Sequence, residues 1–209
     1  MFAQALTLAA ALLLVAPGPG KVWAGAPTDQ LRAQINRTIQ ILDDPELKKP
    51  GKVRDRRAAV RQVANDIFDF GETAKRSLAR HWAARSQAER DEFVQLFADL
   101  LERSYISKIE LYGGEKIRFV GEATDPDGAI VKSRLVTKAD TEIPIDYRMH
   151  LRGGKWLVYD VLIEGVSLIS NYRTQFNKII TTSSYQELVK KMKSKQEEFI
   201  QEEKRTSQK

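Results

Sequence analysis

One segment in the second half of the sequence constrains the fold of this chain more than any other. Residues 156–176 read WLVYDVLIEGVSLISNYRTQF and begin as a strand that is apolar on both faces. Since such strands are usually covered on both sides, we expect this one at the centre of a sheet. Gly165 ends the strand, and the apolar spacing after it predicts a helix that packs back on the sheet. The expected strand faces are Trp156 and Val158 on one side and Leu157, Tyr159, Val161 and Ile163 on the other.

Helical periodicity dominates the sequence before residue 113. Apolar positions at helical spacing predict helices over residues 28–42, 54–67 and 72–82, with a bend at 68–71. Ser86 and Glu89 form a capping-box pattern, in which each side chain satisfies a backbone donor at the start of a helix. The helix that follows has an apolar face of Phe93, Leu96, Phe97, Leu100, Leu101 and Tyr105, and a polar face of Glu92, Gln95, Asp99, Glu102 and Arg103.

After Gly113 and Gly114 the apolar period changes to two, which is typical of strands. Strands are expected to begin near residues 117, 131, 143 and 156, and Gly153 and Gly154 predict the last hairpin. A second capping-box pattern at Ser184 predicts a final helix to about Ile200. This order predicts an α+β fold, with helices packed on a curved, mainly antiparallel four-stranded sheet. The third strand is expected to turn Ile143, Ile145, Tyr147, Met149 and Leu151 inward and Asp146, Arg148, His150 and Arg152 toward water.

The N-terminal residues 1–26 read as a signal peptide. The apolar run at residues 5–16 is shorter than the ~20 residues of a membrane span, and small residues follow at 24–26. The first six residues carry no Lys or Arg, so the signal is atypical or the true start lies upstream, and a retained anchor is the alternative. We expect one domain over residues 27–200 and a polar tail over 201–209.

Composition narrows the chemistry that the chain can perform. The sequence contains no cysteine, which excludes disulfides, thiol catalysis and a lipidated cysteine. The net charge is +6 with a pI of ≈ 9.4. For an exported protein this charge favours anionic lipid headgroups or acidic protein surfaces over nucleic acid, although solubility alone is an equal alternative.

Catalysis and metal binding find little support in the sequence. The two histidines, His81 and His150, are far apart, and no cluster with metal-ligand spacing and no nucleophile motif is present. Asp69 with Glu72 and Asp160 with Glu164 are the candidate carboxylate pairs, and helix capping explains them better than acid–base catalysis. We therefore expect a protein that is not an enzyme and holds no cofactor or metal.

The distinctive feature is an excess of large apolar side chains. Such residues line either an ordinary core or the wall of a cleft, and their pattern does not separate the two. The candidates for a cavity wall are Ile67, Phe68, Phe70, Trp82, Phe93, Leu96, Phe97, Leu100, Tyr105, Ile145, Tyr147, Met149, Leu168, Tyr172 and Phe176.

Two blocks of the sequence resemble one family. The pattern W-x-V-Y-D-V-x-I-E-G-V-S-L-I-x-N-Y-R-x-Q-F at residues 156–176, and the block from Phe68 to Tyr105, resemble the MlaC family of periplasmic phospholipid-binding proteins. The resemblance implies a helix-and-sheet cup that encloses lipid acyl chains in an apolar cavity. It also implies a soluble carrier that exchanges phospholipid with an inner-membrane ABC transporter complex and an outer-membrane lipoprotein–porin complex. One branch of the family is associated with hopanoids, so a hopanoid is an alternative ligand.

Two other functions stay open at this point, a lipid-free adaptor or chaperone and a small hydrolase or isomerase. Arg173, in the Asn171-Tyr172-Arg173 triplet of the family pattern, is the candidate for the rim. There it would bind a phosphate or dock on an acidic partner. The alternative is that it pairs with Asp160 or Glu164 and fixes its helix on the sheet.

Overall fold

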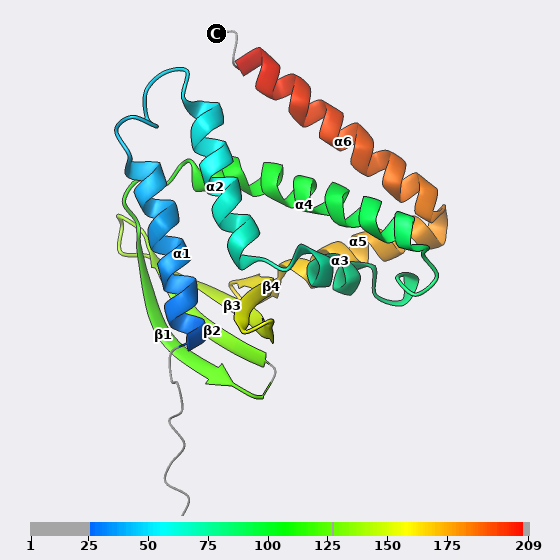
Figure 1. Ribbon diagram of the computed structural model, residues 1–209, viewed down its shortest axis with the longest axis horizontal. Helices are drawn as coiled ribbons and strands as arrows, with labels where there is room; N and C mark the ends of the chain where they lie inside the picture. The colour runs from blue at the N-terminus through cyan, green and yellow to red at the C-terminus, as the bar shows by residue number, and fades with distance from the viewer. Residues whose placement is uncertain (1–25, 127, 207–209) are drawn as a thin grey trace, which may run out of the picture.

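Helices precede and follow an antiparallel sheet in residues 26–126 and 128–206, which the computed structural model describes (Figure 1). This arrangement confirms the predicted α+β class. Before the sheet lie α1 (Ala26–Asp43), α2 (Val53–Ile67), α3 (Phe70–Leu78), a 3-10 turn (Ala79–His81) and α4 (Gln87–Ile109). The strands are β1 (Lys116–Thr124), β2 (Gly128–Val136), β3 (Glu142–Arg152), β4 (Lys155–Ile163) and β5 (Val166–Ser167), and α5 (Leu168–Thr182) and α6 (Tyr185–Thr206) follow.

The sheet has five strands in the order β1-β2-β3-β4-β5, so the expected count of four was one too low. The fifth strand has two residues, which is too short to leave an alternating pattern in the sequence. The position expected for β4 was also wrong, because β4 lies next to the edge of the sheet. Beyond β5, the outer edge of β4 meets an isolated parallel bridge between Val158 and Phe68, and the Asp69 amide donates to the Val158 carbonyl oxygen at 2.9 Å. The backbone before α3 therefore covers the edge that a further strand would have covered.

A β-bulge in β4 changes which side chains share a face. Met149 pairs with Val158 and Arg148 pairs with Asp160, so Tyr159 is the extra residue. An extra residue reverses the alternation beyond it. Val161 accordingly packs in the same cluster as Trp156 and Val158, rather than on the opposite face as expected.

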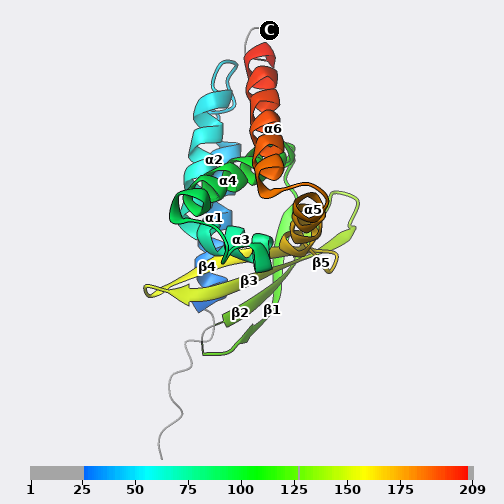
Figure 2. The ribbon, with the colours of Figure 1, turned by 90° about the vertical axis from the view of Figure 1, so that its right-hand side faces the viewer.

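Within the described part of the chain, the buried apolar residues form three clusters. The helical cluster joins α3, α4, α5 and α6, which lie together at one end of the sheet (Figure 2). The sheet cluster joins α1 and the end of α2 to one face of β1–β4, and a small third cluster joins α1, α2 and α4. The centres of the clusters are Phe93, Phe97, Phe176 and Leu188 in the helical cluster, Leu31, Val131, Met149 and Val158 in the sheet cluster, and Leu42, Val60 and Ile106 in the third.

The predicted capping box opens α4. The Ser86 hydroxyl accepts from the Glu89 amide, and the Glu89 carboxylate accepts from the Ser86 amide. Phe93 and Phe97 on the apolar face are 0% and 1% exposed, so this face packs tightly as the periodicity predicts. The helix continues to Ile109, beyond the last residue of the predicted stripe.

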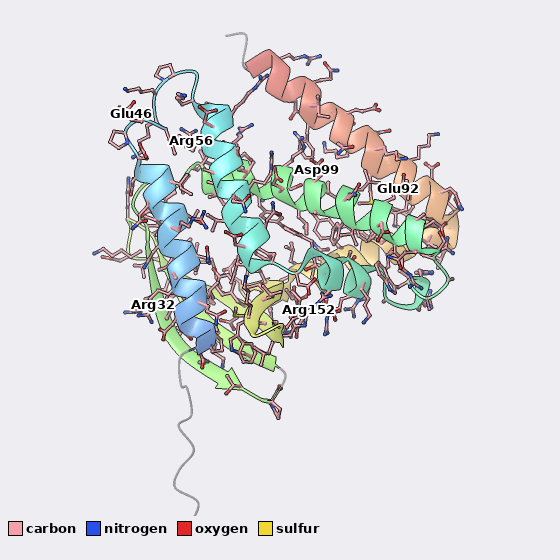
Figure 3. All side chains as sticks on the ribbon, viewed as in Figure 1. Arg32, Glu46, Arg56, Glu92, Asp99 and Arg152 are labelled. Atoms are coloured by element: carbon pink, nitrogen blue, oxygen red, sulfur yellow. The ribbon has the colours of Figure 1, made fainter. Side chains whose placement is uncertain are left out.

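The C-terminal end of α4 is joined to α2 by ion pairs. Arg56 and Arg57 of α2 both contact Glu110, at 3.0 and 2.9 Å, and Arg61 pairs with Glu102. Figure 3 shows Arg56 on α2, the helix that lies beside α4. Three arginines of α2 thus take part in packing between the two helices. Burial would raise the pKa of the Glu110 carboxyl, but the two guanidinium groups outweigh it and hold this pKa below the ordinary value.

Several boundaries differ from expectation by a few residues. α1 begins at Ala26 rather than at Thr28, α3 begins at Phe70 inside the expected bend, and α6 continues past Ile200 to Thr206. Leu151 was expected to face inward but is 45% exposed, because it lies next to the turn of the β3–β4 hairpin. The predicted signal peptide lies outside the described residues except for its last position. Among the described helices, none combines the length and the apolar character needed to cross a membrane.

Candidate functional site

The predicted cavity residues are divided between two clusters instead of lying in one. Ile145 is half-buried and belongs to neither cluster among the described residues. Ten of the predicted cavity residues are in the helical cluster, namely Phe70, Trp82, Phe93, Leu96, Phe97, Leu100, Tyr105, Leu168, Tyr172 and Phe176. Four are in the sheet cluster, namely Ile67, Phe68, Tyr147 and Met149.

The centre of the helical cluster is an aromatic core. The Phe97 ring meets Tyr172 and Phe176 edge to face, with ring centroids 5.0 and 5.2 Å apart, and Phe93 meets Phe176 in the same way at 5.6 Å. Edge-to-face pairs at these distances add to the free energy gained by burial. Phe93 and Phe97 are fully buried, whereas half-buried members such as Leu100 and Tyr105 lie at the margin of the cluster.

Three of the candidate residues are tyrosines whose pKa values are raised by burial. Burial raises the pKa of Tyr147 to about 12, although a hydrogen bond with Ser133 opposes the shift. Burial also raises the pKa of Tyr105 and of Tyr172. These phenols stay neutral at physiological pH, so they offer hydrogen-bonding groups without charge.

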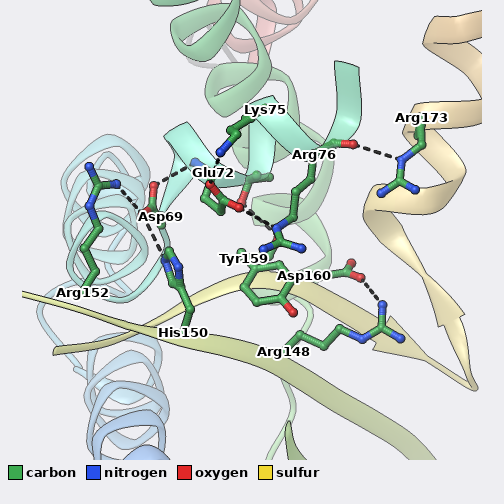
Figure 4. Close-up of polar contacts among 11 residues, drawn as sticks. Asp69, Glu72, Lys75, Arg76, Arg148, His150, Arg152, Tyr159, Asp160 and Arg173 are labelled. Carbon is green, nitrogen blue, oxygen red and sulfur yellow. Dashed lines mark hydrogen bonds and ion pairs between the residues drawn. The ribbon is translucent and has the colours of Figure 1, made fainter. Parts of the chain in front are cut away.

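The Asp69 carboxylate contacts one backbone amide of its own helix and two side chains of β3 (Figure 4). Its carboxylate is 7% exposed and accepts from the Glu72 amide at 2.9 Å, which caps α3 as the sequence predicts. Arg152 Nη1 donates at 2.7 Å and His150 Nε2 lies 3.1 Å away. Burial raises the pKa of the Asp69 carboxyl, but the Glu72 amide and the Arg152 guanidinium lower it by more than burial raises it. The pKa is therefore below its ordinary value.

His150 and Arg152 were expected to face water, and the tie to Asp69 was missed. The alternation of β3 does place both on the polar side of the strand, as predicted. The alternation does not predict that Asp69 contacts these two side chains. Asp69 precedes them by about 80 positions and reaches them only because α3 packs against β4. A lone acid before one helix and two bases on a remote strand give no pairing signal in a single sequence.

An open cleft of about 680 Å³ lies beside this carboxylate. It is bounded by α3, the first half of α4 and the β3–β4 hairpin, and of the predicted cavity residues it includes Trp82. Its size is in the range of small-molecule sites. The lining residues are Gly71, Glu72, Lys75, Trp82, Gln87, Arg90, Asp91, Val94, Gln95, His150, Leu151 and Arg152.

Arg173 does not line this cleft. Its Nε donates to the carbonyl oxygen of Arg76 at 3.0 Å and so joins α5 to α3 (Figure 4). The expected pairing of Arg173 with Asp160 is wrong, although the expectation that it fixes its helix has a physical basis in this bond. Its role at a rim stays a prediction.

Asp160 is a buried helix-capping residue, 4% exposed. It accepts from the Ser167 hydroxyl at 2.7 Å, from the Ile169 amide at 3.1 Å and from Arg148 Nη1 at 3.2 Å. The predicted capping explanation is therefore confirmed for this carboxylate. Glu164, its suggested catalytic partner, lies in the turn before β5 with a positive φ of 52°.

Within residues 26–126 and 128–206, no three His, Cys, Asp or Glu residues come together as metal ligands do. The two imidazoles are engaged, His150 with Asp69 and His81 with Asn177 at 3.0 Å. The cleft with charged walls lies beside the helical cluster, against which its lining residues Trp82 and Val94 pack.

Comparisons with known proteins give a consistent result. A family model described as "MlaC protein" matches residues 32–194. The intermembrane phospholipid transport system binding protein MlaC of Haemophilus influenzae is 24% identical over 138 residues, which are 62% of this chain and 64% of that protein. The match thus spans less than two thirds of that relative. A phospholipid-binding protein from Ralstonia solanacearum, solved in complex with a phospholipid, has the same fold, with a TM-score of 0.73, 20% identity, and coverage of 82% of this chain and 97% of that one.

Proposed function

The chain belongs to the MlaC family, and on that basis we propose that it is a periplasmic lipid carrier. It binds the acyl chains of a phospholipid in an apolar cavity and moves the lipid between the outer and inner membranes. The headgroup stays outside the cavity. In this role the protein acts by binding and release and not as an enzyme.

The observation that supports the proposal most strongly is the position of the half-buried apolar side chains. Leu100, Tyr105 and Tyr172 lie at the margin of the helical cluster, and Tyr147 lies at the margin of the sheet cluster. A single filled core would bury such residues in one continuous cluster. Two clusters with apolar margins suit a protein that takes an acyl chain between them, because each buried methylene contributes about 0.8 kcal/mol.

Export and partners belong to the same proposal. Residues 1–26 are the signal peptide, residues 27–200 form the lipid-binding domain, and residues 201–209 are a polar extension. The partners are an inner-membrane ABC lipid transporter complex and an outer-membrane lipoprotein–porin complex. The relatives support this assignment by name, since one is described as part of an intermembrane phospholipid transport system.

The test is the identity of material that co-purifies with the protein. We expect mass spectrometry of an organic extract from the exported form to show phospholipid at close to one molecule per protein. Finding a hopanoid would keep the carrier and change its cargo. A lipid-free protein that still binds a membrane complex would replace the carrier with an adaptor, and Met1 retained in a membrane fraction would rule out the cleaved signal.

A further inference from the structure

We propose that the cleft between α3, α4 and the β3–β4 hairpin binds a zwitterionic phospholipid headgroup, one that carries both a phosphate and an ammonium group. The inference rests on the proposed lipid-carrier function and adds to it a site and a class of headgroup. The observation behind it is that cationic and anionic side chains line the same open cleft of about 680 Å³.

The cations that remain available for a phosphate are Arg152 and Lys75. The Arg152 side chain is 67% exposed, and its bond to Asp69 uses Nη1, so that Nε and Nη2 have no partner among the described residues. The Lys75 ammonium lies 3.7 Å from the Glu72 carboxylate, beyond hydrogen-bond length, and its side chain is also largely exposed. Asp69 orients the Arg152 guanidinium, whose planar set of donors suits phosphate oxygens.

Arg90 has a different role in the same wall. Its Nε and Nη2 donate to the carbonyl oxygens of Trp82 and Ala83, at 3.3 and 3.2 Å, and its guanidinium lies over the Trp82 ring. These contacts fix the guanidinium against the backbone and the Trp82 ring, so Arg90 holds the wall in place while its Nη1 has no acceptor among the described residues. The cleft thus has two exposed cations at α3 and the hairpin, with a fixed wall opposite.

Asp91 supplies the opposite charge. One of its oxygens accepts from Gln87 Nε2 at 2.8 Å, which leaves the second oxygen to accept from an ammonium group. Glu72 is less available, because Arg76 donates to it at 2.7 Å. An exposed carboxylate in a cleft that binds only anions would weaken binding, whereas a headgroup with both charges meets a partner for each.

Part of the cleft lining is apolar and borders the helical cluster. Trp82 and Val94 line the cleft and also pack against the helical cluster. Leu151, exposed at the hairpin, adds an apolar surface on the opposite wall. A lipid could therefore place its headgroup among the charges while its glycerol and the first methylenes meet Trp82, Val94 and Leu151.

The experiment loads the purified full-length exported protein from vesicles of equimolar phosphatidylethanolamine and phosphatidylglycerol, and measures both bound lipids by native mass spectrometry. Wild type is expected to retain more phosphatidylethanolamine. Asp91→Lys should shift the ratio of the two bound lipids toward phosphatidylglycerol by about threefold, the size of an exposed charge pair. Arg152→Gln and, independently, Lys75→Gln should lower the amount of both lipids. Matched controls outside the cleft are Asp55→Lys on α2 and Lys132→Gln on β2, which should leave ratio and amount unchanged.

The outcomes separate this inference from the function on which it rests. Wild type that binds no lipid at all would overturn the carrier proposal. Wild type that binds lipid, with a ratio that Asp91→Lys leaves unchanged, would overturn the headgroup cleft and keep the carrier. Inorganic phosphate is the third probe. If it competes with lipid in an Arg152-dependent way while Asp91 has no influence, the cleft is a simple anion site and the zwitterionic assignment is wrong.

Discussion

The Asp69 carboxylate and the Arg152 guanidinium are 83 positions apart in sequence and 2.7 Å apart in space. This contact ties the start of α3 to the β3–β4 hairpin, and the same carboxylate caps the helix. A single side chain thus sets the position of two walls of the cleft relative to each other.

Replacing Asp69 should loosen both elements at once. We expect Asp69→Ala to lower the free energy of unfolding by about 2–3 kcal/mol, because it removes a helix cap and leaves His150 without its partner. Urea unfolding measures the loss, and hydrogen exchange should show faster exchange in the hairpin. Asp55→Ala, which breaks an exposed pair with Lys52, is the control and should have little effect. Equal losses in the two variants would contradict a special role for Asp69.

Stability should fall in acid, and Glu110 should account for part of the fall. Its folded pKa is below the unfolded value, so its contribution is complete above the unfolded pKa and is lost as the pH falls through the folded pKa. We expect Glu110→Gln to cost about 1–3 kcal/mol at pH 7 and progressively less as the pH is lowered below about 4. Urea titrations of both proteins from pH 7 to pH 3 measure this. If the difference in free energy of unfolding between the two proteins stays constant with pH, Glu110 contributes through its shape and not through its charge.

Two tryptophan substitutions on α4 separate core from cavity margin. Leu96 is buried, so Leu96→Trp should overpack the helical cluster and cost about 1–3 kcal/mol. Leu100 is half-buried at its margin, so Leu100→Trp should leave the melting temperature nearly unchanged and reduce the lipid bound per protein. Thermal unfolding together with quantitative lipid analysis makes the comparison. If Leu100→Trp destabilises the fold while its lipid content stays normal, the margin is plain core.

Arg173 can be tested separately from the cleft. Its bond to the Arg76 carbonyl oxygen is exposed, so Arg173→Glu should cost only about 1 kcal/mol and leave the fold intact. If Arg173 acts at the rim, the variant should hold lipid normally and deliver it slowly to acceptor membranes that carry the partner complexes. Lys178→Glu on the same helix is the matched control. A variant that transfers lipid at the normal rate would remove Arg173 from the rim.

Elements with strong local signals could be predicted from the amino-acid sequence alone. The Ser86–Glu89 capping box, the apolar face of α4 and the alternation of β3 depend on neighbours within a few residues, so a single sequence contains them. The capping by Asp69 belongs to the same group, because its acceptor and donor are three positions apart.

The arrangement of the sheet edge and of the cleft could not be predicted from the sequence, because both depend on contacts between residues far apart in the chain. The bulge at Tyr159 leaves no mark in the residue types of β4, because it depends on how β4 pairs with β3. The bridge between Phe68 and Val158 joins backbone segments that are far apart in the chain. For the same reason the apolar candidates were found but not their division into two clusters, and the cleft of Lys75, Asp91 and Arg152 was not foreseen. Hydrophobic periodicity reports which face of an element is buried, whereas the partner that buries it is selected by long-range packing.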